Sequence, residues 1–262
     1  PEQFVGLEPG VAERSQIPRW LAEAGYTVLV PAILSRSNEL SGSPYVAYTD
    51  QTHREFVYRQ AFEMGRHVIG FDVQAIMAAV DTIHGVPTAR NELPTAVGLV
   101  GVGEGGLLAM YAAALDTRIN TTYVSGYFQK REDVWTEPIY RNVCGLLTEF
   151  GDAEIAGRIA PRQFVIEAAG IPEHAGPPSN KPGRRAGAAP GRIETATLAS
   201  VRVGYDRLRE TYTTLQAHES CQVVSTVYCG DAPGTGPAVA ACPAATAGGT
   251  PSATRSRATP TE

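Results

Sequence analysis

The sequence lacks three features that would narrow its class at once: a long apolar run, a dense basic segment and a cluster of metal-binding side chains. No apolar stretch approaches the roughly 18–20 residues that a membrane-spanning helix requires, so we expect no membrane span. The net charge is −5 and no segment concentrates Lys and Arg, which argues against nucleic acid as a partner. The four cysteines form no CxxC pair and no Cys/His cluster with zinc spacing, so we expect no metal and no cofactor.

The chain also lacks a charged-then-apolar leader at Pro1, so its compartment stays open, as does its oligomeric state. With 262 residues and a hydrophobic fraction of 43%, we expect one domain over residues 1–237. Residues 174–192 are rich in Pro, Gly and Arg and predict an exposed, mobile insertion loop. Residues 238–262 are mostly Ala, Thr, Pro, Gly and Ser and predict a disordered tail.

Apolar segments of two kinds alternate along the chain. Short β-rich runs predict strands, and longer amphipathic runs between them predict helices. The predicted strands are YTVLVPA, AVGLV, NTTYVSGYF, RQFVIEAA and QVVSTVY, and one long helical region is expected from Thr52 to Ile83. This alternation predicts an α/β fold: a three-layer α/β/α sandwich with a mostly parallel sheet, and with any site along the carboxyl ends of the strands.

The stretch VGLVGVGEGGLLAMYAAAL, Val97 to Leu115, runs a strand into a helix through a glycine-rich turn. Gly101, Gly103 and Gly106 have the G-x-G-x-x-G spacing of a dinucleotide-binding turn. Glu104 opposes that interpretation because its negative charge lies where a pyrophosphate would bind. A second interpretation is a turn whose glycines relieve steric strain without a ligand.

The third interpretation is the small-x-nucleophile-x-small turn of α/β hydrolases, with Gly101 and Gly105 as the small residues. In this frame the nucleophile position is Gly103, and glycine offers no atom that can attack a carbonyl. Glu104 is the neighbouring candidate: its carboxylate could act as a general base or a metal ligand, or it could cap the free N–H groups of the first helical turn.

Two longer segments carry a resemblance to a known family. They are THREFVYRQAFEMGRHVIGFDVQAIMAAVD before the turn, with its Gly65-Arg66-x-x-x-Gly70 element, and the segment from Val124 to Arg162 after it, which includes VSGYF, Trp135, PIY and IAPR. Together they resemble the acetyl xylan esterase-like and dienelactone hydrolase-like branch of the α/β-hydrolase superfamily, over about residues 12 to 170. The resemblance implies the α/β-hydrolase fold, an ester-hydrolase ancestry, and a chain that starts after the first strands of that fold.

The catalytic residues that the resemblance implies transfer poorly to this sequence. The serine position of the family falls on Gly103, and no histidine follows QVVSTVY. The acid position follows RQFVIEAA, where Glu167 and Glu173 are available. His174 stands beside Glu173 and could complete a proton relay or a weak metal site, so the candidate site residues are Gly103, Glu104, Glu173 and His174.

Other polar residues of the helical region allow two interpretations. His53 and His67 are fourteen residues apart and could share a helical face, although helical histidines more often serve as structural hydrogen-bonding groups. Arg54, Arg59 and Arg66 could line an anionic pocket or form salt bridges.

Two functional hypotheses remain from the sequence. One is an esterase-like enzyme without the usual serine, and the other is a non-catalytic pseudoenzyme that binds a small-molecule or carbohydrate ester ligand.

Overall fold

Four parallel strands form the central sheet of the computed structural model, which describes residues 2–38, 49–85, 96–180 and 182–225. They are β1 (Val97–Val102), β2 (Ile119–Ser125), β3 (Gln163–Ala168) and β4 (Cys221–Ser225). They lie side by side in chain order, β1-β2-β3-β4, and every neighbouring pair is parallel. Each strand overlaps one of the β-rich runs that the sequence predicted, and β3 lies wholly inside its run.

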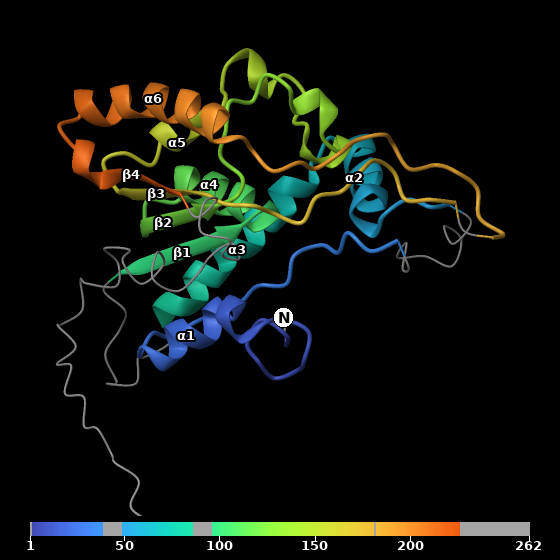
Figure 1. Cartoon of the computed structure of the whole chain (residues 1–262), viewed down its shortest axis with the longest axis horizontal. Coiled ribbons are helices and arrows are strands. Elements are labelled where there is room, and N and C mark those ends of the chain that lie inside the picture. Colours follow the sequence, from blue (N-terminus) through green and yellow to red (C-terminus); the bar gives the residue numbers. More distant parts are fainter. Residues whose placement is uncertain (1, 39–48, 86–95, 181, 226–262) are drawn as a thin grey trace, which may run out of the picture.

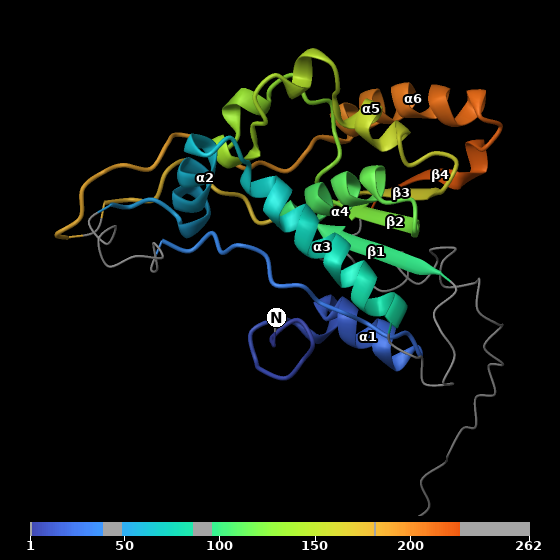
Figure 2. The ribbon, with the colours of Figure 1, turned by 180° about the vertical axis from the view of Figure 1, so that it is seen from behind.

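Helices cover one face of this sheet and a single described helix covers the other (Figures 1 and 2). The crossover helices α4 (Glu104–Leu115), α5 (Asp152–Gly157) and α6 (Leu198–Thr214) join successive strands and, with α3 (Val68–Gly85), bury the larger core. Because right-handed crossovers that advance in one direction place their helices on one side, this arrangement follows from the strand order. On the opposite face Ile17 of α1 (Ile17–Glu23) packs against Tyr123 and Val165. The predicted three-layer α/β fold is confirmed.

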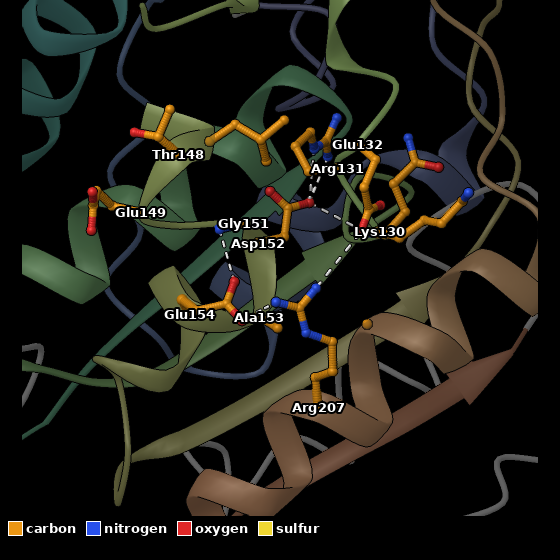
Figure 3. Close-up of a pocket in the computed structure, with 13 residues that line it drawn as sticks. Lys130, Arg131, Glu132, Thr148, Glu149, Gly151, Asp152, Ala153, Glu154 and Arg207 are labelled. Carbon is orange, nitrogen blue, oxygen red and sulfur yellow. Dashed lines mark hydrogen bonds and ion pairs between the residues drawn. The ribbon is translucent and has the colours of Figure 1, made fainter. Parts of the chain in front are cut away.

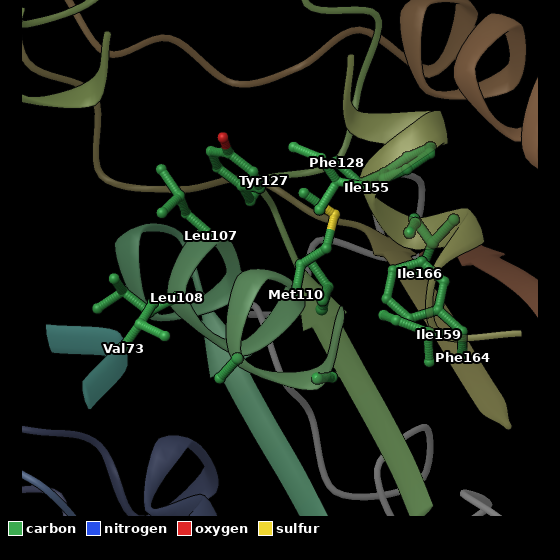
Figure 4. Close-up of a cluster of buried hydrophobic side chains, with 14 of the residues drawn as sticks. Val73, Leu107, Leu108, Met110, Tyr127, Phe128, Ile155, Ile159, Phe164 and Ile166 are labelled. Atoms are coloured by element: carbon green, nitrogen blue, oxygen red, sulfur yellow. The ribbon is translucent and has the colours of Figure 1, made fainter. Parts of the chain in front are cut away.

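The larger core is built around α4, whose Leu107, Leu108 and Met110 are fully buried (Figure 4). Phe128 and Phe164 meet edge to face beside it, with ring centroids 6.1 Å apart. A helix this apolar on all sides is stable only when it is enclosed, so the carboxyl ends of β1 and β2 and the start of α4 are held rigidly in the molecule.

One predicted strand is absent. Residues 26–32, YTVLVPA, belong to no strand, and Tyr26 and Leu29 are exposed. A strand requires a hydrogen-bonded neighbour, and within the described residues this segment has none. The apolar, β-rich composition was therefore not sufficient to make it a strand.

The single long helix predicted from Thr52 to Ile83 is two helices, α2 (His53–Glu63) and α3. Gly65 adopts a φ of +67° at the break, a conformation that favours glycine. Thr52 caps α2 by accepting the N–H of Glu55, and His67 caps α3 by accepting the N–H of Ile69 at Nδ1. The remaining short helical turns are η1 (Glu13–Ser15), η3 (Val134–Thr136), η4 (Ile139–Arg141), η5 (Leu146–Thr148) and η6 (His218–Ser220).

The predicted insertion loop, residues 174–192, runs beside α2 (Figure 1). The carboxylate of Glu55 in α2 accepts the N–H of Ala189 at 2.8 Å, and the side chain of Gln51 donates to the carbonyl of Gly187 at 3.0 Å. The mobility of this segment stays a prediction.

The predicted tail, residues 238–262, lies outside the described residues. Among the helices that are described, none combines the length and the apolar character needed to cross a membrane.

Candidate functional site

The bend between β1 and α4 is made by one residue, Gly103. Its φ of +55° and ψ of −115° are rarely adopted by residues with a side chain. Its N–H donates to the carbonyl of Ser125 at 2.9 Å, and its own carbonyl accepts the N–H groups of Gly106 and Leu107. The residue at the nucleophile position in the hydrolase frame therefore stands between strand and helix, at the carboxyl edge of the sheet.

The glycines around the bend have different roles. A Cβ on Gly101 would lie 2.0 Å from the carbonyl oxygen of Gly105, and one on Gly106 would lie 3.1 Å from side-chain atoms of Tyr127 and Val124. These two glycines let the strand and the helix pack closely. A Cβ on Gly103 would meet only Ile171 Cγ2, at 3.8 Å, so there is room for a side chain at this position.

Glu104, the first residue of α4, is 4% exposed and is held between two arginines. Arg141 Nε donates to Oε2 at 2.7 Å, and Arg54 Nη2 lies 3.2 Å from Oε1. Burial raises the pKa of this carboxyl, but the charges of Arg141 and Arg54 outweigh it and the net pKa lies below its usual value. The carboxylate is ionised and pairs with side chains distant in sequence, whereas the sequence had suggested a helix cap or a free base.

This pair belongs to a longer chain of buried ion pairs that the sequence did not reveal. The chain alternates in sign and connects α3, α2, α4, η4, the segment after β2 and α5, in the order Asp72, Arg54, Glu104, Arg141, Glu137, Arg131 and Asp152. Arg54 also lies 5.5 Å from the centre of the Tyr140 ring, and Arg131 lies 4.2 Å from that of Tyr127. The network ties the start of α4 to the segments that surround the bend.

The other two candidate residues lie on the segment that follows β3. Glu173 is exposed and accepts the N–H of Thr195 at 3.1 Å, and the backbone of exposed His174 pairs with Ile193. In the described part of the chain no hydrogen bond or ion pair joins either residue to Glu104. The residue of this segment that reaches the bend is Ile171. Its side chain lies against both Gly103 and Gly126.

Glu167, the alternative acid from the sequence, lies inside β3. It is 1% exposed and pairs in register with Ser125 on β2 and Val224 on β4, and Ser125 in turn pairs with Val102 on β1. Because Val165, two residues earlier, faces α1, Glu167 and its neighbour Ser125 lie on the α1 face of the sheet.

His67 has a structural role. It precedes the first residue of α3, whereas His53 begins α2, so the two do not share a helical face as the spacing had suggested. Its Nδ1 accepts the N–H of Ile69, which leaves Nε2 to donate to the carbonyl of Asn142 at 3.3 Å. Burial lowers the pKa of this imidazole.

Within the described ranges no group of three or more His, Cys, Asp or Glu side chains is arranged to hold a metal ion.

A model of the dienelactone hydrolase family matches residues 2–137, about half of the sequence. The chain belongs to this family, and the resemblance predicted from its sequence is confirmed. A search of curated proteins found no match.

Three solved structures with a similar fold are described as esterases. A candidate acetyl xylan esterase from Bacteroides fragilis NCTC 9343 has a TM-score of 0.48 and 14% identity over 67% of this chain and 41% of its own. A methylesterase has a TM-score of 0.41 and 14% identity over 66% and 33% of the two chains. A glucuronoyl esterase of carbohydrate esterase family 15 from Caldicellulosiruptor kristjansonii has the same TM-score and identity over 66% and 48%. The chain thus spans less than half of the length of each of these structures.

Proposed function

We propose that this chain keeps the bend of an acyl-ester hydrolase but does not form a covalent acyl intermediate there, and that it binds a small-molecule or carbohydrate ester ligand. The observation that carries the proposal is the residue at the tip of the bend, Gly103, which has no side-chain oxygen or sulfur. Gly103 is buried, and a Cβ at this position would have one neighbour within 4 Å, Ile171 Cγ2 at 3.8 Å.

The environment of Glu104 argues against a hydrolase that uses this carboxylate as its base. Arg54 and Arg141 hold the carboxylate ionised, but a general base must also reach the proton that it removes. Glu104 is buried, its Oε2 accepts from Arg141, and its Oε1 forms an ion pair with Arg54. Glu173 and His174 are exposed, and we retain them in the proposal as groups that contact a polar part of the ligand.

Turnover of a chromogenic short-chain acyl ester and labelling by a fluorophosphonate probe test the proposal. The wild-type chain is expected to show neither. Glu104→Gln is compared with Glu63→Gln, an exposed position on α2, as the control for a lost carboxylate. An acyl or phosphonyl adduct located by mass spectrometry, or turnover that Glu104→Gln abolishes, would contradict the proposal.

Binding is measured separately, as thermal stabilisation of the chain by an acetylated monosaccharide. A ligand that binds only the folded state stabilises it by RT ln(1 + c/Kd), where c is its free concentration, so the melting temperature rises with the logarithm of that concentration once it exceeds Kd. Stabilisation that Glu173→Gln or His174→Gln reduces would support the proposed contacts. Stabilisation by NAD instead would favour the dinucleotide-binding turn at Gly101-x-Gly103-x-x-Gly106.

A further inference from the structure

A polar cavity of about 280 Å³ lies between the segment after β2, the start of α5 and one side of α6 (Figure 3). It is separate from the bend, because Gly103 and Ile171 are not among the residues that line it. Its lining contains no aromatic side chain, and Leu147 is its one large apolar residue. This composition disfavours an apolar ligand.

The inner end of the cavity is a buried ion pair. Asp152 is 2% exposed and Arg131 is 8% exposed. Asp152 Oδ2 accepts from Arg131 Nη2 at 2.6 Å, from Arg131 Nε at 3.1 Å and from the N–H of Gln129 at 3.3 Å. These bonds fix the position of both charges before any ligand arrives.

Most of the charges that line the outer part of the cavity are also paired, and exposed Glu149 lines it without an ion pair to any described residue. In Figure 3 the guanidinium of Arg207, on α6, points to the carboxylate of Glu154 and toward Glu132. Arg207 bonds to Glu154, and its Nη1 lies 3.7 Å from Glu132 Oε1. Lys130 Nζ lies 3.7 Å from Asp133. Cations and anions thus alternate around the cavity.

This pairing determines which ligands the cavity can accept. An anion would have to displace Glu154 from Arg207 or Asp152 from Arg131, and in the second case it would leave a buried carboxylate without its partner, which costs free energy. A neutral hydroxyl group can donate to a carboxylate and accept from a guanidinium without breaking the pair. The volume is slightly below the roughly 300 Å³ at which pockets for drug-sized ligands begin, so the ligand must be small.

We infer that this cavity is a binding site for a small neutral polyol, a molecule with several adjacent hydroxyl groups. Its hydroxyls bridge Arg207, Glu154 and the Arg131–Asp152 pair. The site stands independently of the bend and of the function proposed for it.

The test is titration of the isotope-labelled chain with sorbitol, followed by amide chemical shifts and calorimetry. Saturable shifts are expected at Gly151 and Gly204, which line the cavity. Arg207→Met keeps the apolar stem but removes the guanidinium, and it is expected to weaken binding about tenfold. The matched control is Arg202→Met on the same helix, an exposed position outside the cavity, which is expected to bind as the wild type does.

Acetate and methylammonium, as single-charge probes, test the chemical class. The inference predicts no saturable binding of either at the cavity. It is overturned if sorbitol produces no saturable shifts, if Arg207→Met binds it unchanged, or if a charged probe binds at these residues instead. Glu154→Gln offers a second variant, because its amide oxygen can still accept the N–H of Gly151 that the Glu154 carboxylate accepts in the wild type.

Discussion

Replacing a glycine by alanine is expected to change stability differently at three glycines near the bend, because their surroundings in the fold differ. A Cβ on Gly101 would overlap the carbonyl of Gly105, one on Gly103 has space but a positive φ, and one on Gly105 has space in a helix. We expect Gly105→Ala to be neutral or to stabilise by up to about 1 kcal/mol, and Gly103→Ala to destabilise by about 1–3 kcal/mol. Gly101→Ala is expected to destabilise most.

Urea unfolding of the three variants measures this order. Gly105→Ala serves as the control because it adds the same methyl group one residue into α4. If Gly103→Ala were as stable as Gly105→Ala, the backbone at the bend would not be held in the conformation described.

His67 is expected to make stability depend on pH. Its pKa in the folded chain is lowered by burial, whereas in the unfolded chain it returns to about 6.5. Below that value the unfolded state binds more protons than the folded state, so acidification favours unfolding.

Unfolding free energies of the wild type and of His67→Gln, measured between about pH 5 and pH 8, check this expectation. The variant should lose less stability on acidification, and values at the alkaline end provide the baseline for each protein. Equal slopes in the two proteins would contradict the assignment.

At the scale of elements, the segment 185–189 is fastened to α2 by few contacts. Glu55 accepts both the N–H of Ala189 and the guanidinium of Arg59. Replacing Glu55 by Ala is expected to release this segment and to speed trypsin cleavage at Arg184 and Arg185 several-fold. Gel analysis of limited proteolysis provides the measurement.

Glu63→Ala, an exposed position on the same helix, is the matched control and should leave the cleavage rate unchanged. If the wild type is cut as fast as Glu55→Ala, the segment is already free, as the mobility predicted from the composition of residues 174–192 would require.

Across the whole molecule, the buried ion pairs connect the bend to the polar cavity. In this series of ion pairs, Glu104 lies beside the bend and Asp152 lies at the cavity. Arg141, Glu137 and Arg131 connect the two carboxylates. Removing either carboxylate charge leaves buried arginines without full compensation, and each of Glu104→Gln and Asp152→Asn should destabilise by about 3–5 kcal/mol.

A double-mutant cycle tests whether the network acts as one unit. We expect the effects of Glu104→Gln and Asp152→Asn to depart from additivity by more than about 0.5 kcal/mol, because they share a continuous set of partners. Glu104→Gln combined with Asp81→Asn is the control, since Asp81 is exposed and pairs with Arg118 outside the network. Additivity in both cycles would mean that the ion pairs act separately.

Local sequence patterns determined the elements and the class of this protein. Short β-rich runs predicted β1 to β4, their alternation with helices predicted the parallel α/β sheet, and the glycine-rich stretch predicted the turn in which Gly103 lies. These properties depend on residues within a few positions of one another, so they can be read along the chain.

Only the tertiary structure decided which distant residues meet. It left residues 26–32 outside the sheet because a strand needs a neighbour, it placed Ile171 rather than Glu173 against the bend, and it paired Glu104 with Arg54 and Arg141. Each outcome depends on contacts between segments that are distant in sequence. The hydrogen bond between Glu104 and Arg141, for example, joins residues 37 positions apart. Spacing along the chain carries no information about such contacts, because packing of the helices over the sheet brings them together.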